Sequence, residues 1–323
     1  MMLEETDYVL IIGSSNMDLN IYSKRFPNPG ETVTGGTFKQ FLGGKGANQS
    51  VASVRSGVKT VFIGKIGIDI FGDQMISQLT KEGINMNHVI RDPEEMSGVA
   101  FILIDENGEN MISVAPGANI KLSPQDIRSK TSIIENAKCI VVQMEIPMDT
   151  IKEILNISTE LDNIKILNPA PLKPLPKQLL EKVDIIIPNK GELFKMHSLL
   201  GFEDLDVEEN ENILQVSKDI ASLGIKYVIT TLGARGCFIY SRGENKAIEV
   251  AAPNVKAVDT VGAGDCFIGV LASRLCKGEK VLNAVKYASV AASIAVTRKG
   301  AQVSMPFSNE VEAKLKELAI EIE

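Results

Sequence analysis

The sequence predicts an α/β protein with a mostly parallel central sheet, helices on both faces and a small separate β-sheet. From residue 138 onwards, short apolar runs typical of buried strands alternate with segments of helical periodicity. Two β-rich pieces, at about 16–42 and 98–114, interrupt this rhythm. The chain has 323 residues and no linker or repeat that divides it. We therefore expect a single α/β domain over 1–323, with the two β pieces forming a small sheet over one end.

The first half of the chain begins with a uniformly apolar strand. Gly13 follows this strand, and Gly57 and Gly83 each end a helix, because glycine commonly follows a helix C-terminus. Asn107-Gly108 lies between two alternating runs and predicts a hairpin within the second β piece. The expected elements are strands at 8–12, 60–66, 98–104 and 110–114, and helices that open at 43–48 and run to 55, and at 69–82.

The second half alternates strands and helices up to a tail helix. A proline-rich loop at 169–176 and an acidic, solvated loop at 203–211 separate some of these elements. The expected strands are 138–143, 164–167, 184–187, 227–231, 237–240 and an apolar run ending near 258. The expected helices are 148–157, 190–200, 213–223, 266–277, 280–296 and one that starts at 309.

Composition excludes several classes of protein. The net charge is −7 and no basic stripe is present, so we expect no nucleic-acid partner. No apolar run approaches the roughly 20 residues that cross a bilayer, and the acidic start does not resemble a signal peptide. The four cysteines are scattered without a CxxC pair, which favours buried free thiols in a reducing cytoplasm. His88 and His197 are the only histidines, so a histidine metal cluster or a Ser-His-Asp triad is poorly supported.

One stretch, 259–265 with the sequence DTVGAGD, organises the chemistry. Glycines before a helix let the backbone approach a ligand, and the free N–H groups of the first turn, with the helix dipole, attract an anion. Asp265 places a carboxylate there, where it could remove a proton from a hydroxyl that faces a phosphate. The alternative is a glycine turn followed by an acidic residue that only stabilises the helix.

Further polar groups follow the predicted strands. Asn16 and Asp18 could bind sugar hydroxyls or cap a turn, and Glu145 could hold a hydroxyl or be merely solvated. The stretch 43–48 is a second close backbone approach. It matches neither a Walker A loop nor a GxGxxG dinucleotide turn, which argues against P-loop NTPases and Rossmann dehydrogenases.

Three later segments each allow two interpretations. Asn189 and Glu192 are close to a capping box, but a capped helix start is also a place for phosphate and magnesium. The segment 231–236 is a hairpin turn that could run along a nucleotide. The segment 295–300 is a helix end whose carbonyls could hold a hard cation, together with Asp259 and Ser304.

Taken together and in order, these motifs resemble the ribokinase-type (PfkB) carbohydrate kinases. GGKGAN at 43–48 is similar to their N-terminal glycine signature, PNKGE at 188–192 to their NxxE motif and DTVGAGD at 259–265 to their C-terminal signature. The match spans essentially the whole chain. It continues in the segments NMD at 16–18, PGETV at 29–33, NPAP at 168–171 and AVTRKGAQ at 295–302.

The resemblance implies a three-layer ribokinase-like domain whose small sheet is a lid, often shared across a homodimer. It implies ATP-dependent phosphorylation of D-ribose at O5, with magnesium and potassium as cofactors. Carried over by position, Asp265 would be the general base, and the amides of Gly262, Ala263 and Gly264 would form an anion hole.

The resemblance also implies three sets of binding residues. The sugar would be held at Asn16, Met17, Asp18, Gly44, Lys45, Gly46, Ala47, Asn48, Glu145 and Asp265. ATP would be held at Asn189, Thr231, Leu232, Gly233, Ala234, Arg235, Gly236 and Gly264, with Glu192 orienting magnesium. Potassium would be ringed by Asp259, Val261, Ala295, Arg298, Gly300 and Ser304.

Other functions stay open at this point. Met17 lies between two expected sugar ligands and leaves the width of the substrate undecided, whereas polar Asn16 favours a fully hydroxylated sugar. The absence of Trp and the few aromatics in the expected lid speak against a nucleoside. The rivals are a kinase for a 2-deoxy sugar, a ketohexose or a nucleoside, a sugar sensor without turnover, and a scaffold protein.

Overall fold

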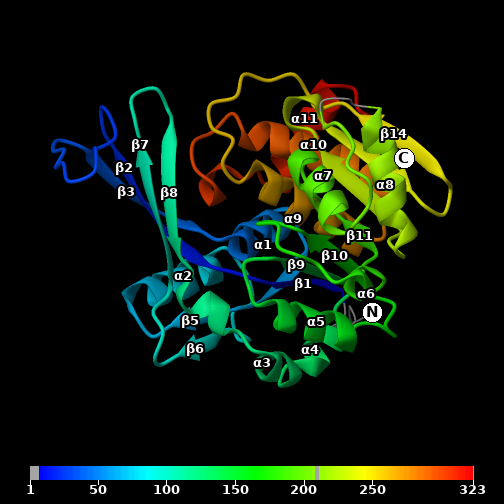
Figure 1. Ribbon diagram of the computed structural model, residues 1–323, viewed down its shortest axis with the longest axis horizontal. Helices are drawn as coiled ribbons and strands as arrows, with labels where there is room; N and C mark the ends of the chain where they lie inside the picture. Colours follow the sequence, from blue (N-terminus) through cyan, green and yellow to red (C-terminus); the bar gives the residue numbers. More distant parts are fainter. Residues whose placement is uncertain (1–6, 208–210, 323) are drawn as a thin grey trace.

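An eight-stranded sheet forms the body of the protein. The computed structural model describes residues 7–207 and 211–322 of the chain (Figure 1). The strand order is β14-β13-β12-β11-β10-β9-β1-β4, in which the strands from β12 to β4 are parallel and β13 and β14 are added antiparallel. The strands are β1 Tyr8–Ile12, β4 Lys59–Ile63, β9 Cys139–Gln143, β10 Ile164–Asn168, β11 Ile185–Ile186, β12 Tyr227–Thr231, β13 Cys237–Ser241 and β14 Lys246–Val250.

Helices cover both faces of this sheet, because alternate residues of its strands enter two apolar cores. Val9 and Ile11 of β1 pack on one side, and Leu10 and Ile12 pack on the other. The first core is closed by α1 Lys45–Arg55, α2 Ile70–Lys81, α9 Ala263–Cys276, α10 Val281–Ala295 and α11 Ser308–Glu317. The second is closed by α3 Pro124–Arg128, α4 Thr131–Glu135, α5 Met148–Ile157, α6 Lys177–Leu180, α7 Lys190–Leu199 and α8 Asn212–Ser222.

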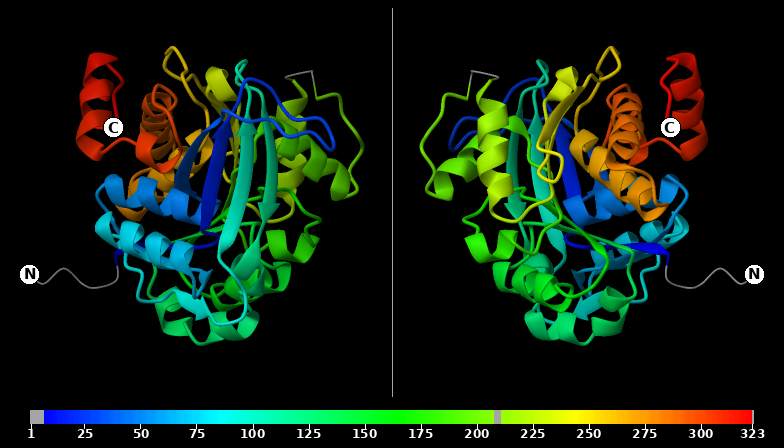
Figure 2. Two further views of the ribbon diagram at one scale, coloured as in Figure 1. Left: turned by 90° about the vertical axis from the view of Figure 1, so that its left-hand side faces the viewer. Right: turned by 90° about the vertical axis from the view of Figure 1, so that its right-hand side faces the viewer.

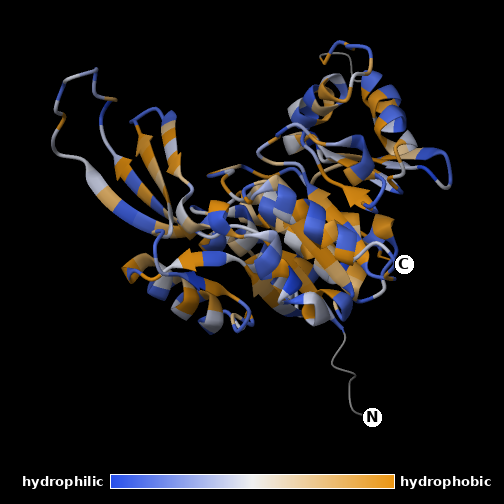
Figure 3. Cartoon of the chain, turned by 60° about the horizontal axis from the view of Figure 1, so that its bottom comes forward, coloured by the Kyte–Doolittle hydropathy of each residue, from blue (hydrophilic) through white to orange (hydrophobic). Residues whose placement is uncertain are grey.

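A second sheet of four strands stands at one end of the body (Figures 1 and 2). Its order is β3-β2-β7-β8, with a parallel pair in the middle and an antiparallel strand on each side. The hydropathy colours mix along this sheet, whereas orange dominates the centre of the body (Figure 3). The strands are β2 Asn16–Tyr22, β3 Thr37–Gly43, β7 Gly98–Ile104 and β8 Asn110–Ala115. The remaining elements are a two-stranded sheet, β5 Lys65–Gly67 with β6 Ile90–Asp92, and short 3₁₀ turns η1 Gly117–Lys121, η2 Gly233–Arg235 and η3 Gln302–Ser304.

Most predicted elements are confirmed, but three boundaries are wrong and one predicted strand is absent from the described residues. The run expected at 60–66 is two strands in different sheets, β4 and β5, separated at Gly64. The strand expected to end near Val258 does not form; the final strand is β14, and 251–258 is irregular. Helix α9 begins at Ala263, three residues before the predicted Cys266, and β11 is only two residues long. The acidic loop is irregular over 203–207, and 208–210 lie outside the described residues.

The cysteines and His197 have the surroundings that composition predicts. All four cysteines are buried and unpaired. His197 is buried, stacks on Phe202 and lies 2.9 Å from Asp219, which is a packing role. Within 7–207 and 211–322, none of the helices is both long and apolar enough for a membrane span, and no cluster of metal-binding side chains is found.

Candidate active site

The candidate site lies where the direction of the sheet's connections reverses. β1 and β9 are neighbours in the sheet. From the carboxyl end of β1 the chain goes on to β4 on one side, and from the carboxyl end of β9 it goes on to β10 on the other side. Ligands of such sheets bind in the crevice between the two diverging connections. The start of α1 packs tightly on the segment after β1. A Cβ at Gly46 would lie 2.8 Å from the Ser14 nitrogen, and Ala47 N–H donates to Ser14 at 2.9 Å. Glycine at 46 is therefore required for this approach.

Helix α9 begins beside this crevice with its amides only partly used. Gly262 precedes the helix with a left-handed φ of 76°, a conformation that favours glycine. Ala263 N–H donates to Thr260 at 3.3 Å, whereas the N–H groups of Gly262 and Gly264 have no partner in the described part of the chain. Two amides and the helix dipole are therefore available for an anion.

The Asp265 carboxylate is buried and receives two side-chain donors. Asn48 Nδ2 donates to Oδ2 at 2.9 Å, and Gln49 Nε2 donates to Oδ1 at 3.0 Å. Asp265 is 8% exposed, so its remaining open side is directed to the crevice rather than to bulk water. This is the geometry of a carboxylate held in one orientation with free acceptor capacity.

Charged groups surround this carboxylate. The pKa of Lys45 is raised, chiefly by the negative charge of Asp265 and also by that of Glu145. Burial, then Glu145, then Asp265, raises the pKa of Asp18 to about 7. Glu145 itself accepts from Lys45 N–H at 3.0 Å and from the Ser14 hydroxyl. Three carboxylates and one ammonium thus converge from the ends of four different elements.

Asn16 and Asp18 lie on one face of β2, next to this cluster. Asn16 is buried, and its Oδ1 accepts from Asn119 Nδ2 at 2.8 Å, which leaves Nδ2 of Asn16 as the donor toward a ligand. Gly43 of the neighbouring strand β3 pairs with Asn16, and a Cβ at Gly43 would lie 2.2 Å from the Asp18 carboxylate, so glycine leaves room for that side chain. These side chains could bind the hydroxyls of a small polyol.

A cavity of about 150 Å³ joins the carboxylate to the start of helix α7. Asn189 caps this helix: its Oδ1 accepts from Glu192 N–H at 2.8 Å, and its own N–H donates to Glu192 at 2.9 Å. Burial raises the pKa of Glu192. The cavity is lined by Lys45, Asn168, Ala170, Ile187, Asn189, Glu192, Thr231, Gly262, Gly264, Asp265 and Ile268.

The segments expected to hold a monovalent cation also meet. Asp259 accepts from Val261 N–H at 3.0 Å and from Gly300 N–H at 2.8 Å, which ties the loop before α9 to the loop after α10. Arg298 N–H donates to Ala295 O at 3.0 Å, and Arg298 Nη1 donates to Ser304 O at 3.5 Å. Carboxylate and carbonyl oxygens are hard ligands, which suit an alkali cation, so the donor set fits.

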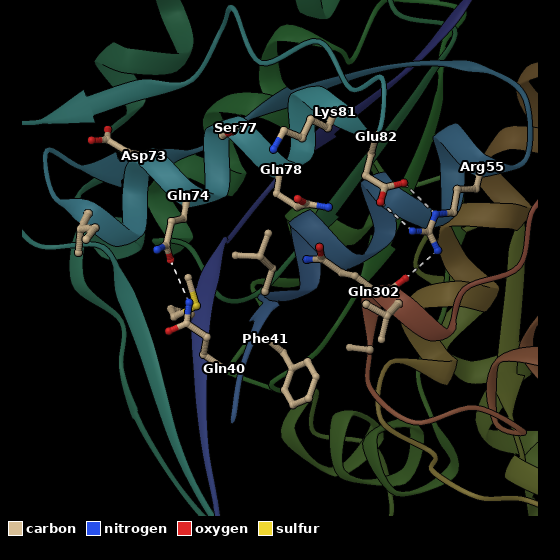
Figure 4. A pocket seen from close by; sticks show the side chains of 15 residues that line it. Gln40, Phe41, Arg55, Asp73, Gln74, Ser77, Gln78, Lys81, Glu82 and Gln302 are labelled. Carbon is tan, nitrogen blue, oxygen red and sulfur yellow. Dashed lines mark hydrogen bonds and ion pairs between the residues drawn. The ribbon is translucent and has the colours of Figure 1, made fainter. Parts of the chain in front are cut away.

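A larger cavity of about 550 Å³ lies between β3, α2 and the turn η3 (Figure 4). Met17, Phe41, Gln74 and Gln302 are among the residues that line it. None of the carboxylates that converge on Lys45 reaches it, so we place the chemistry in the smaller cavity. Its relevance to the site is Gln302, whose Nε2 donates to Asn48 Oδ1 at 3.1 Å.

The structure brings most of the expected residues together, with three exceptions. Met17 lines the larger cavity, on the face of β2 opposite Asn16 and Asp18, and Ala47 is fully buried, so neither side chain reaches the carboxylate cluster. Of the segment 231–236, Thr231 alone lines the smaller cavity, while Arg235 is exposed. The turn itself is the predicted hairpin between β12 and β13.

Sequence reasoning missed the buried carboxamides of the site. Gln49 contacts Asp265 and Asn119 contacts Asn16, while Gln143 and Asn168 contact Gln49. All four carboxamides are buried. Gln143 ends an otherwise apolar strand, and Asn168 ends another, which is a signal that could have been read. Gln49 gave no such signal, because a glutamine within a helix is usually solvated.

Comparison with known proteins agrees with this arrangement. A family model described as pfkB family carbohydrate kinase matches residues 6–308. A ribokinase of Staphylococcus aureus is 36% identical over 95% of this chain and 99% of its own length. A deoxyribokinase of Salmonella typhi is also 36% identical, over 92% of this chain and 95% of its own length. The structure of Arabidopsis thaliana ribokinase complexed with ribose and ATP has a TM-score of 0.88 at 30% identity, covering 96% of this chain and 98% of that one.

Proposed function

The chain belongs to the pfkB family of carbohydrate kinases, and we propose that it transfers the γ-phosphoryl group of ATP to O5 of D-ribose. The observation that carries this proposal is Asp265, a buried carboxylate in the first turn of α9, beside two unpartnered amides and a cavity. The related ribokinases extend the proposal to the substrate, since they match over nearly the whole chain.

In the proposed reaction, the Asp265 carboxylate takes the proton of the O5 hydroxyl as O5 attacks the γ-phosphorus. A bond forms between O5 and phosphorus, the bond from phosphorus to the β-phosphate oxygen breaks, and ADP leaves. The amides of Gly262 and Gly264 stabilise the charge on the transferred group, joined by Ala263 once its long bond to Thr260 opens. Positioning and charge stabilisation are what phosphoryl transfer mainly requires.

The sugar is proposed to lie between β2 and the start of α1. Asn16 and Asp18 bind hydroxyls from one side, and Lys45, Asn48 and Glu145 bind them from the other. Gly44 and Gly46 contribute by letting the backbone approach, since a Cβ at Gly44 would lie 2.7 Å from Ser15. Met17 and Ala47 act only through the backbone, in line with where their side chains point.

ATP is proposed to occupy the smaller cavity and extend along the segment 231–236. Asn189 and Thr231 line that cavity, and Glu192 is placed to orient magnesium through water. Asp259, Val261, Ala295, Arg298, Gly300 and Ser304 would hold potassium, because their oxygens lie along two connected loops. When bound, magnesium would neutralise phosphate charge, and potassium would fix the loop before α9.

The small sheet is proposed to act as a lid that excludes water from the reaction and is shared across a homodimer. Ile112 and Val114 of β8 are 57% and 53% exposed and lie on the same face as Asp18. A partner copy that covered them would also cover the sugar. The four buried free thiols suit a reducing cytoplasm, where we place the protein.

A substrate panel tests the proposal. Purified protein with ATP, magnesium and potassium is assayed against ribose, 2-deoxyribose, fructose and adenosine, and again with sodium in place of potassium. We expect turnover with ribose and lower activity in sodium. Sugar binding without turnover would contradict the kinase proposal and favour a sugar sensor. Equal activity in sodium and potassium would contradict the proposed potassium-binding residues.

A second candidate substrate is 2-deoxyribose, because a deoxyribokinase matches this chain as well as a ribokinase does. Asn16 favours ribose. Its Nδ2 is a donor on a buried residue, and a 2-hydroxyl could accept from it whereas a 2-deoxy sugar could not. The ratio of kcat/KM for the two sugars decides between them.

A further inference from the structure

We propose that Gln49 and Gln302 are positioning residues that hold the Asp265 carboxylate in one orientation, aimed at the acceptor hydroxyl, through a chain of buried carboxamides. The inference rests on the proposed role of Asp265 as the base and adds residues to which no role has been given. It stands on two series of hydrogen bonds, one for each oxygen of the carboxylate.

The first series fixes Gln49 in a single orientation. Its Nε2 uses both hydrogens, one to Asp265 Oδ1 at 3.0 Å and one to Asn168 Oδ1 at 3.3 Å. Its Oε1 accepts from Gln143 Nε2 at 2.6 Å. Gln49 and Gln143 are both 0% exposed, so water does not compete for these groups.

The direction of this series is imposed by the carboxylate. An ionised carboxylate only accepts, so Gln49 must turn its amide nitrogen toward Asp265, and Gln143 must then turn its own nitrogen toward Gln49. The series ends at Gln143 Oε1, which is buried and has no partner among the residues described. Because the Gln143 oxygen is left without a donor while Asp265 receives one, we infer that the series is arranged to orient Asp265.

The second series fixes Asn48 in the same way. Gln302 Nε2 donates to Asn48 Oδ1 at 3.1 Å, and Asn48 Nδ2 then donates to Asp265 Oδ2 at 2.9 Å. The amide of Asn48 cannot flip without losing both bonds. Its second hydrogen stays free for the sugar.

Gln302 is in turn held rigidly. Arg55 Nη1 donates to the backbone carbonyls of Gln302 at 2.9 Å and Met305 at 2.7 Å. Arg55 also donates to the Glu82 carboxylate, from Nε at 2.9 Å and from Nη2 at 2.7 Å (Figure 4). The turn that carries Gln302 is thereby fixed to α1 and to the end of α2. The larger cavity is bounded by the same residues but is not needed for this role.

Each oxygen of the Asp265 carboxylate thus receives one side-chain N–H donor, from Gln49 on Oδ1 and from Asn48 on Oδ2. Both donors are neutral amides, so they orient the carboxylate without competing for the proton that it is proposed to receive.

The test replaces three glutamines, one at a time, with methionine. Gln49→Met and Gln302→Met remove a donor while keeping a side chain of similar length, and Gln74→Met is the matched control. Gln74 lines the larger cavity and bonds to Gln40 at 3.2 Å, away from Asp265. We expect Gln49→Met to lower kcat roughly tenfold or more with a smaller change in the ribose KM, and to move the acidic limb of the kcat–pH profile to higher pH. Gln302→Met should do the same more weakly, and Gln74→Met should leave both unchanged.

A second background separates this inference from the function on which it rests. In Asp265→Asn, Gln49→Met should change the residual kcat less than twofold, although it lowers the melting temperature by the same amount in both backgrounds. An equal loss of kcat in both backgrounds, or an unmoved pH profile, would overturn the positioning role. Wild-type turnover in Asp265→Asn alone would overturn the proposed base instead. If Gln49→Met does not fold, Gln302→Met in the same two backgrounds decides the question.

Discussion

The two sheets of this molecule use similar strands in different surroundings. β9 in the body and β8 in the small sheet are both short and rich in apolar residues, yet every residue of β9 is buried and every residue of β8 is exposed. Ile140 and Ile112 are 0% and 57% exposed. Helices cover both faces of the body sheet, whereas the small sheet has apolar side chains on faces that nothing within the described chain covers.

This difference separates two tasks. The body is stabilised by its own core and can hold the base, the amides and the loops of the site in fixed positions. Most residues of the small sheet are half-buried or exposed, and few buried contacts are typical of regions with low local stability. Asp265 belongs to the first region, and Asn16 and Asp18 belong to the second.

The largest effect should come from comparing the same change in the two regions. Asp265→Asn removes the proton acceptor and should lower kcat by about 10²–10⁴-fold with little change in ribose affinity. Asp18→Asn should instead raise the ribose KM, by roughly tenfold, with a smaller effect on kcat. Steady-state kinetics of both variants measures this split. Equal losses in kcat from the two would show that the regions do not divide the work in this way.

The second prediction concerns stability. Ile140→Ala opens a cavity in the core and should lower the free energy of unfolding by about 2–5 kcal/mol, whereas Ile112→Ala should change it by no more than about 0.5 kcal/mol. Urea denaturation of dilute protein measures both. Comparable losses from the two variants would mean that the small sheet is as much a part of the core as the body.

The sequence predicted the body better than the small sheet, for a physical reason. β1 is uniformly apolar and β9 is apolar except for Gln143, because both strands are buried on both faces, so they could be recognised without knowing their neighbours. The parallel pairing of β2 with β7 depends on segments about 80 residues apart, which no local pattern reveals. β14 was missed, because it is an edge strand in which none of the five residues is buried, so it lacks the continuous apolar run of a central strand.

The site divides in the same way. The segment 259–265 was recognisable, because an anion site at a helix start requires glycines at fixed spacing. Gln49 and Gln302 were not, because their role comes from contacts across 216 and 254 residues of sequence. A buried carboxamide looks the same as a solvated one until the fold places its partners.

The third prediction uses pH to distinguish the two regions. The pKa of Asp18 is raised to about 7, chiefly by burial, from an ordinary value of 3.8. Between these values the folded protein keeps a proton that the unfolded chain has released, so the contribution of Asp18 to stability declines as the pH rises through this range. Ribose binding should follow the opposite trend, since the ionised carboxylate is the better acceptor.

Urea unfolding and ribose KM, each measured at pH 5 and pH 8, check this expectation. The wild type should lose stability relative to Asp18→Asn as the pH rises, and its KM should fall, whereas the variant's KM should change less. The other carboxylates are common to both proteins, so the difference isolates Asp18. Parallel curves for the two proteins would contradict the expectation.

The smallest effect on stability should accompany a clear effect on assembly. Ile112→Glu places a charge on the exposed face of the small sheet, where it should leave the free energy of unfolding of the dilute protein within about 0.5 kcal/mol. If a second copy covers that face, the same charge would be buried without a partner and should weaken the dimer strongly. Sedimentation should then show a mass shift from dimer to monomer, and the ribose KM should rise because the partner copy no longer covers the sugar.

Glu109→Gln, in the turn that leads into β8, is the control and should keep the wild-type mass. An unchanged mass for Ile112→Glu would show that a partner copy does not cover this face, and the exposed residues of the small sheet would then need another explanation.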